Sequence, residues 1–130
     1  MPFRIQCACC AIASILLFVS CSSSPQDKIV NRWKPVDQYG SEAKKEKFKS
    51  RMARHVMEWE FTKDGKFNGY SDGVLQGTAD YTMASDGKSV VIKDGGMSES
   101  IKIIKLTSNM MEVQTDILWN GRDTVILKAQ

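Results

Sequence analysis

Glycine-containing turns divide this chain at short intervals from residue 64 onward. Because Gly and Asn adopt positive φ at little cost, such pairs are typical of tight hairpin turns. The segments between them are rich in β-branched and aromatic residues, which favour strands. The pattern therefore predicts short strands joined by hairpins, with turns at Asp64-Gly65, Asp72-Gly73, Asp86-Gly87, Asp94-Gly95-Gly96, Asn120-Gly121 and, more weakly, Ser108-Asn109.

Hydrophobic and polar residues alternate within these segments. The alternation is clearest where Met57, Trp59 and Phe61 oppose Glu58 and Glu60, so one face of each strand is expected in a core and the other in water. Sequential hairpins of this kind close most simply into an all-β, eight-stranded, antiparallel up-and-down barrel without exposed edges. The eight strands are predicted at 29–37, 55–63, 66–71, 76–84, 89–94, 100–107, 110–118 and 123–129.

The connection between the first two strands has a different composition. Residues 41–54 contain no turn signal, and most are good or fair helix formers. Ser41 suits an N-cap, and Phe48 and Met52 are i,i+4 neighbours. The sequence predicts one short helix between strands 1 and 2. It carries a net charge of +4, from two acidic residues and six basic ones: Lys44, Lys45, Lys47, Lys49, Arg51 and Arg54.

Two interpretations of this basic helix are open. It is either a solvated helix packed on the barrel through Phe48 and Met52, or a basic lid over the barrel mouth. A lid would face the anionic head of an amphipathic ligand or anionic lipid headgroups.

The first 20 residues have the composition of an export signal. Arg4 and the N-terminal amine are positive, and an apolar and small-residue run follows at 7–19. The run has 13 residues, fewer than the roughly 20 of a membrane-spanning helix. Small Ser20 stands directly before Cys21. Residues 1–20 are therefore predicted to be a signal peptide.

The junction Phe18-Val19-Ser20-Cys21 resembles the lipobox of bacterial lipoproteins, although Leu is usual where this chain has Phe18. The resemblance implies a diacylglyceryl group on the Cys21 thiol, cleavage after Ser20, and acylation of the new amine, as with palmitate. Residues 21–28 are then the lipidated cysteine and a flexible polar tether. Ser22 favours, by analogy with enterobacterial sorting, the outer membrane, facing the periplasm or the cell surface. The alternatives are a secreted protein with a spare cysteine, or an uncleaved anchor.

Removal of the signal leaves 110 residues, which suffice for one domain with its own core at 29–130. Three cysteines leave with the signal and Cys21 is used by lipid, so no thiol remains for a disulfide, a nucleophile or a metal site. The mature chain has 17 basic and 15 acidic residues, a net charge of +2. Nothing in this balance indicates nucleic acid as a partner.

Several segments together resemble the small lipocalin-like lipoproteins of Gram-negative bacteria. These are Trp33 in the first strand, the F-x-x-D-G-x-F hairpin at 61–67, Gly77-Thr78-Ala79-Asp80-Tyr81, and the strands at 86–92 and 104–113. True lipocalins have Gly two residues before the tryptophan, where this chain has Asn31, and they pack a late Arg on it, a role that Arg122 fits poorly. The resemblance implies an eight-stranded calyx and names no ligand.

Catalysis finds little support in the sequence. His55 is the only histidine, so a His-rich metal site is excluded. No G-x-S-x-G turn presents a serine, and Glu58 and Glu60 lie on the outward face of a strand. We therefore expect no enzyme, no cofactor and no metal.

Binding is the better-supported class of function. The candidate ligand-binding residues are the inward-facing Trp33, Met57, Trp59, Phe61 and Tyr81, although an eight-stranded barrel is narrow enough for such side chains simply to fill it. We expect a lipid-anchored protein of the cell envelope that binds a small apolar or amphipathic ligand in the barrel. The alternative is a non-enzymatic interaction or inhibitor module with a solid barrel, docking on another envelope protein.

Overall fold

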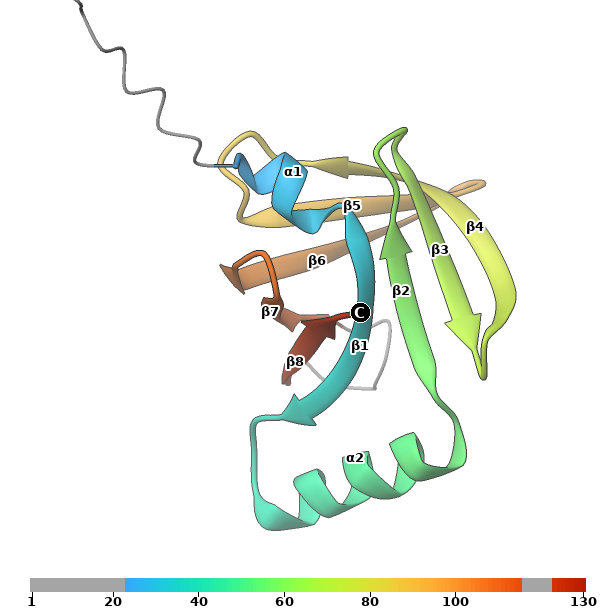
Figure 1. Cartoon of the computed structure of the whole chain (residues 1–130), viewed down its shortest axis with the longest axis vertical. Helices are drawn as coiled ribbons and strands as arrows, with labels where there is room; N and C mark the ends of the chain where they lie inside the picture. Colours follow the sequence, from blue (N-terminus) through green and yellow to red (C-terminus); the bar gives the residue numbers. More distant parts are fainter. Residues whose placement is uncertain (1–22, 116–122) are drawn as a thin grey trace, which may run out of the picture.

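The computed structural model describes residues 23–115 and 123–130 of the chain. Within them, eight antiparallel strands follow one another in sequence order, and β8 pairs back to β1 to close a barrel (Figure 1). This confirms the predicted all-β up-and-down barrel with a short helix between strands 1 and 2. The elements are α1 (Pro25–Ile29), β1 (Asn31–Gln38), α2 (Glu42–Arg54), β2 (Met57–Phe61), β3 (Lys66–Ser71), β4 (Val74–Met83), β5 (Ser89–Asp94), β6 (Met97–Leu106), β7 (Met110–Gln114) and β8 (Thr124–Ala129).

The predicted alternation sets the two faces of the barrel wall. Trp59 and Phe61 are buried, and an aromatic cluster forms around them: ring centroids lie 5.8 Å apart for Trp59 and Phe67 and 5.0 Å apart for Phe61 and Tyr81. Such contacts add to the apolar area that the aromatic side chains bury. The buried core consists of Ile29, Trp33, Phe48, Trp59, Phe61, Val90, Ile92, Ile101, Ile103, Met111, Val113, Val125 and Leu127.

The outer face of β1, β2 and β3 carries a polar network. Arg32 forms a 2.7 Å ion pair with Glu58, and its guanidinium lies 3.9 Å from the ring centroid of Tyr70. Glu60 accepts a hydrogen bond from the Asn68 amide at 2.8 Å. The two glutamates therefore point away from the core, as the sequence predicts, and are used in contacts between strands.

Some strands begin or end at other residues than predicted, because the adjoining turn or helix is longer or shorter than expected. β2 ends at Phe61 because Thr62 and Gly65 already form the hairpin turn, with Gly65 N donating to Thr62 O at 3.2 Å. β6 begins at Met97, three residues earlier than predicted, because the turn before it is tight. The strand predicted at 110–118 ends at Gln114, because Thr115 is not in a strand, and residues 116–118 lie outside the described residues.

The helix α1 is absent from the predicted elements, because the sequence pattern places residues 25–28 in the flexible tether and Ile29 in the first strand. Ser24 is its N-cap and accepts from Asp27 N at 3.3 Å, while the Ser24 hydroxyl lies 2.9 Å from the Asp27 carboxylate. Pro25 occupies the first turn, where its missing N–H is not needed. The sequence Ser-Pro-x-Asp is thus a helix start, and it shortens the polar segment between Cys21 and the domain.

α1 is docked on one end of the barrel. Ile29 is buried, and its carbonyl accepts a 2.9 Å hydrogen bond from the Trp33 indole. Pro25 packs on the β4–β5 turn so closely that a Cβ built on Gly87 would lie 2.5 Å from Pro25 Cβ. Gly87 also has a φ of +71°, so both the turn and the helix contact require glycine there.

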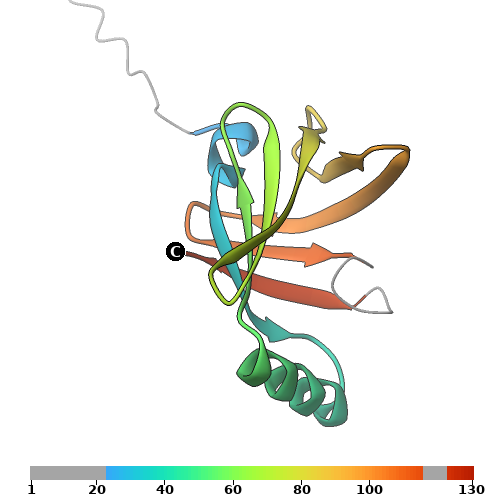
Figure 2. The same ribbon diagram turned by 90° about the vertical axis from the view of Figure 1, so that its right-hand side faces the viewer.

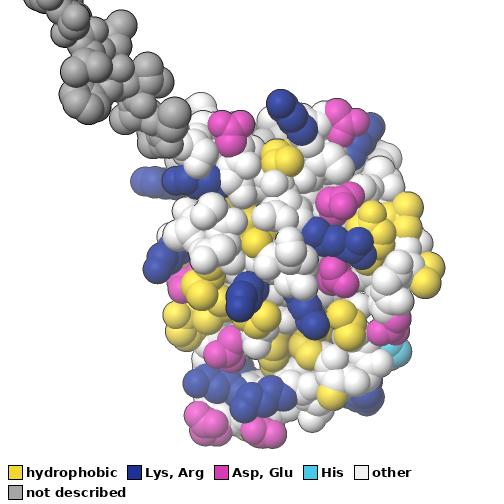
Figure 3. All heavy atoms as spheres, viewed as in Figure 1, with side chains coloured by type: hydrophobic (Ala, Val, Ile, Leu, Met, Phe, Trp, Pro, Cys, Tyr) yellow, Lys and Arg dark blue, Asp and Glu magenta, His cyan; other side chains and the backbone are white. Residues whose placement is uncertain are grey.

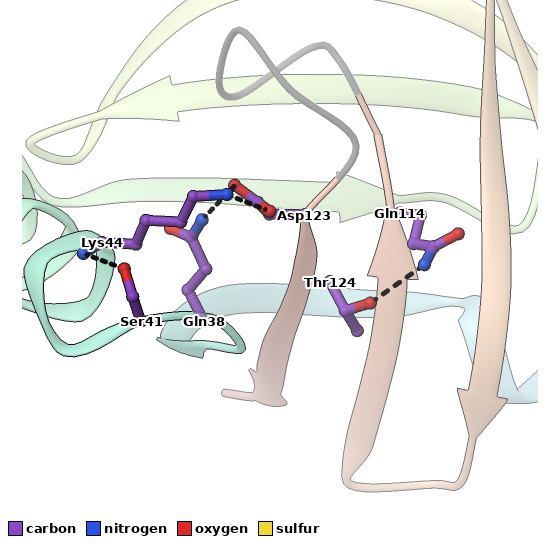
Figure 4. A network of polar contacts seen from close by, with 6 residues as sticks. All are labelled: Gln38, Ser41, Lys44, Gln114, Asp123 and Thr124. Carbon is purple, nitrogen blue, oxygen red and sulfur yellow. Dashed lines mark hydrogen bonds and ion pairs between the residues drawn. The ribbon is translucent and has the colours of Figure 1, made fainter.

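α2 crosses the opposite end of the barrel (Figures 1 and 2). Ser41 caps it as predicted, accepting from Lys44 N at 3.4 Å, and Phe48 is buried in the core. Figure 4 shows how its first turn is tied to Asp123, the residue directly before β8: Lys44 Nζ lies 2.9 Å from Asp123 Oδ1. Gln38, the last residue of β1, donates from Nε2 to Asp123 Oδ2 at 3.0 Å. The helix is therefore held on the barrel by apolar packing and by this ion pair.

The β3–β4 turn gives a prediction for acid stability. Asp72 has a φ of +51° and accepts from Val56 N at 2.9 Å, while His55 Nδ1 lies 3.4 Å away. The hydrogen bond from Val56, followed by the one from His55, lowers the pKa of Asp72 below its usual 3.8. Because the folded-state pKa is lowered, the stabilisation is present above about pH 4 and is lost as the pH falls through the folded-state value.

Asp72→Asn tolerates the same positive φ but cannot ionise. Urea unfolding between pH 5 and pH 2.5, roughly the range over which such a carboxylate titrates, should show a midpoint that falls less steeply for the variant than for the natural protein. Parallel curves would show that Asp72 carries none of the acid dependence.

Candidate functional site

The barrel wall is split between β4 and β5. Among the described residues, β4 pairs with β5 over Asp80–Met83 alone, while it pairs with β3 from Val74 to Asp80. Residues 74–79 thus leave one strand edge without a partner strand. The tip of the β5–β6 hairpin stands away from the β3–β4 turn in both views, and Figure 2 looks onto the gap.

Two glycines lie side by side on the inward face at this split. Trp59 pairs with Gly69, and Gly69 pairs with Gly77. Since directly opposed residues share a face of the sheet, both glycines face inward like the buried Trp59. A Cβ built at either would meet no atom within 4 Å. The chain therefore leaves space at two adjacent positions where a barrel of this size normally places side chains.

The space is part of an open cleft of about 470 Å³, named here the β4–β5 cleft. Phe67, Ala79 and Ile92 give it an apolar floor, and Asp94 and Glu99 stand on its β5–β6 side. Its volume falls in the range of ligand pockets, about 300–1,000 Å³. The lining residues are Phe67, Gly69, Gln76, Gly77, Thr78, Ala79, Ile92, Asp94, Met97 and Glu99.

Exposed hydrophobic side chains border this region. Val74 is 62% exposed, Leu75 51% and Met97 71%. Figure 3 shows hydrophobic side chains gathered at the right-hand edge, over β3 and β4, and charged ones over α2 at the bottom. Neighbouring exposed apolar side chains are typical of a binding surface.

A second groove, of about 530 Å³, lies where α2 meets β2 and β3; it is named here the α2 groove. Met57 and Ser71 pair across β2 and β3, one inward row beyond Trp59 and Gly69. The rest of the lining is basic: Arg51, Arg54 and His55. The two grooves therefore border successive rows of one inward face, with basic residues at one and acidic residues at the other.

The candidate ligand-binding residues separate into two groups. Trp33, Trp59 and Phe61 are at most 3% exposed and form part of the packed core, and Tyr81 is half-buried with its hydroxyl donating to Thr62 O at 2.7 Å. Burial, more than the nearby Asp64, raises the pKa of Tyr81 above its usual value. Of the five, Met57 alone lines one of the two grooves.

The six basic residues of α2 do not form one cluster around an opening. Lys44 pairs with Asp123, Lys45 Nζ lies 3.9 Å from Glu42, and Lys49 Nζ lies 3.7 Å from Glu46. Arg51 and Arg54 line the α2 groove. Lys47 is exposed on the helix. Half of the predicted lid is thus engaged with carboxylates.

Within residues 23–115 and 123–130, no cluster of His, Cys, Asp and Glu side chains is arranged to hold a metal ion. No helix in the same ranges is long and apolar enough to cross a membrane. The predicted lipidation site Cys21 lies outside the described residues, as does Arg122.

The cleft itself was not predicted, although the sequence carries its signal. Gly69 and Gly77 interrupt strand segments and belong to none of the expected turns, and an isolated glycine within a strand often marks a close approach of another group. What the sequence does not give is their pairing, which depends on the register of β3 against β4 and on the bulge after Gly69.

No family model matches this chain, and no curated protein or solved structure does so.

Proposed function

We propose that this protein is a lipid-anchored component of the cell envelope that holds a small apolar or amphipathic ligand in the β4–β5 cleft. The anchor is proposed from the N-terminal signal and from Cys21 after Ser20. The ligand site is proposed from one observation, the paired inward glycines. They create an apolar space beside a packed aromatic core at two adjacent positions, Gly69 and Gly77.

Because part of the barrel interior is filled by side chains, a ligand site in the barrel wall is better supported than a deep calyx. Trp33, Trp59 and Phe61 occupy the interior at the level of β1 and β2, so a ligand would lie against the aromatic cluster instead of within it. Phe67 offers one face to that cluster and also lines the cleft. Apolar contact with such a floor supplies roughly 25 cal/mol per Å² of area removed from water.

Filling the space tests this proposal. Gly77→Val adds a β-branched side chain where no atom lies within 4 Å and where φ is not positive, so the fold should tolerate it. Titration of a dodecyl compound, followed by tryptophan fluorescence or calorimetry, should show binding to the natural protein and at least about tenfold weaker binding to the variant, as expected when the pocket is occupied.

Ser100→Val is the matched control. Ser100 lies on β6 opposite Val91, next to Glu99 but on the outward face of the strand. The substitution places the same isopropyl side chain on the outer surface and not in the cleft, so ligand binding should be unchanged. Equal binding by the natural protein and Gly77→Val would refute the cleft as the ligand site.

A second function is favoured by the unpaired edge of β4. An extended segment of another envelope protein could add a strand there, with main-chain hydrogen bonds giving most of the affinity. Gly77→Val keeps the main chain of this edge intact, so a partner that adds a strand would still bind the variant while a cleft ligand would not. Co-purification with the natural protein and the variant, compared side by side, separates the two functions.

A further inference from the structure

We infer that the β4–β5 cleft selects an amphiphile with a cationic, hydrogen-bond-donating head, such as a primary alkylammonium, over one with an anionic head. This inference rests on the proposed function and adds the chemical class of the ligand. It also reverses the expectation drawn from the basic helix, which favours an anionic head.

The first argument is the position of two carboxylates. Val90 and Ile92 are buried, so alternation places Asp94 on the inward face of β5; Glu99, opposite Ile92, lies on the inward face of β6. Both residues line the cleft beside its apolar floor. Neither forms an ion pair with any residue that the structure describes. A cation that enters the cleft therefore finds two carboxylates without a competing positive partner.

The second argument is the main chain of β4. Tyr81 N donates to Gly65 O, toward β3, and alternate residues of an antiparallel strand direct their N–H and C=O to the same side. The main-chain N–H and C=O of Asp80 are therefore directed toward β5, and the main-chain N–H and C=O of Thr78 toward the unpaired edge. The Thr78 side chain is used elsewhere, donating to Asn68 Oδ1 at 2.8 Å. The Thr78 carbonyl is thus an acceptor at the cleft for an N–H donor.

The third argument is where the basic residues are. Lys93 and Lys102 lie opposite Ser98 and Ser89 on the outward face of the β5–β6 hairpin. Arg51 and Arg54 line the α2 groove and not the cleft. No lysine or arginine is among the cleft-lining residues within the described ranges. An anionic head there would face like charges without a compensating cation.

The contribution of the charges should be selective and not large. Both carboxylates are exposed, and exposed ion pairs are weak and screened by salt. The alkyl chain then supplies most of the affinity, and the head sets the preference. We expect dodecylammonium to bind about fivefold to tenfold more tightly than dodecanoate at low salt, with a smaller ratio at 0.5 M salt, where the screening length is only about 4 Å.

The experiment is isothermal titration of the mature chain, residues 21–130 with Cys21→Ser, which contains every described residue. The ligands are dodecylammonium chloride, sodium dodecanoate and uncharged dodecanol, each below the concentration at which it aggregates. The natural cleft is compared with Asp94→Asn plus Glu99→Gln, and with Glu46→Gln, which removes an exposed carboxylate of α2.

The cleft carboxylate variant should lose the preference for dodecylammonium while dodecanol binding stays within about twofold, and Glu46→Gln should keep the preference. The inference would be overturned if dodecanoate bound as tightly as dodecylammonium or more tightly. Weaker dodecanoate binding by Arg51→Gln plus Arg54→Gln would then place the head of the ligand in the α2 groove. If none of the three ligands binds to the protein with the natural cleft, the result contradicts the proposed function itself and not only the preference for a cationic head.

Discussion

Trp59→Ala should destabilise the domain by about 3–5 kcal/mol, as truncation of a buried aromatic residue does. Trp59 is 3% exposed, lies opposite Trp33 across β1 and β2, and packs edge-to-face on Phe67. The neighbouring space at Gly69 and Gly77 gives the remaining core little to collapse onto. Because small domains have a total stability of about 5–15 kcal/mol, the variant should unfold at a much lower urea concentration.

Glu60→Ala is the control on the other face of the same strand. Glu60 accepts hydrogen bonds from Asn68 at 2.8 Å and from Tyr70 at 3.3 Å, so its loss should cost roughly 1 kcal/mol. Equal losses for the two variants in urea unfolding would contradict the inward position of Trp59.

Cys21→Ser should change the location of the protein completely. If Cys21 carries the proposed diacylglyceryl group and an amide-linked chain, attachment uses more than one acyl chain, and each buried CH₂ contributes about 0.8 kcal/mol. Detergent-phase partitioning of whole-cell extracts should then place the natural protein in the detergent phase. The variant should appear in the aqueous phase or as an unprocessed precursor.

The control for this experiment is Ser24→Ala, which changes the N-cap of α1 and leaves the lipobox intact. It should partition with the natural protein. Detergent-phase partitioning of Cys21→Ser equal to that of the natural protein would refute lipidation at this residue.

The fold could be predicted because local signals agree with the tertiary structure. The Asp-Gly and Asp-Gly-Gly turns lie where hairpins form, with positive φ at Gly65, Gly73, Gly87 and Gly95. Alternation within β2 and β7 matches the buried and outward residues. In an up-and-down barrel each strand pairs with its sequence neighbours, so the order of strands follows from the order of turns.

The cleft could not be predicted, because it depends on contacts between residues that are far apart in the sequence, and local signals do not fix these contacts. β4 is one continuous strand, yet it pairs with β5 over four residues and diverges before Asp80. Similarly, Trp59 and Met57 are two residues apart in β2 and face the same side of the strand, but Trp59 is in the core and Met57 lines the α2 groove. Which inward residue a ligand can reach is set by the residues opposite it, and these follow from register and twist.

The docking of α1 has a consequence for how the protein would stand on a membrane. With α1 packed on the barrel from Pro25 onward, four residue steps separate it from Cys21, a reach of at most about 14 Å. α2 lies at the opposite end (Figure 1), beyond the eight residues of β1, which extend about 26 Å.

That separation exceeds the screening length of about 8 Å at physiological salt. A lipid on Cys21 would therefore hold the α1 end nearest its own leaflet and turn the basic residues of α2 outward. Of the two anionic partners considered for this helix, the headgroups of such an anchoring leaflet would then be out of electrostatic range. In that orientation, an anion that α2 meets would come from the aqueous side.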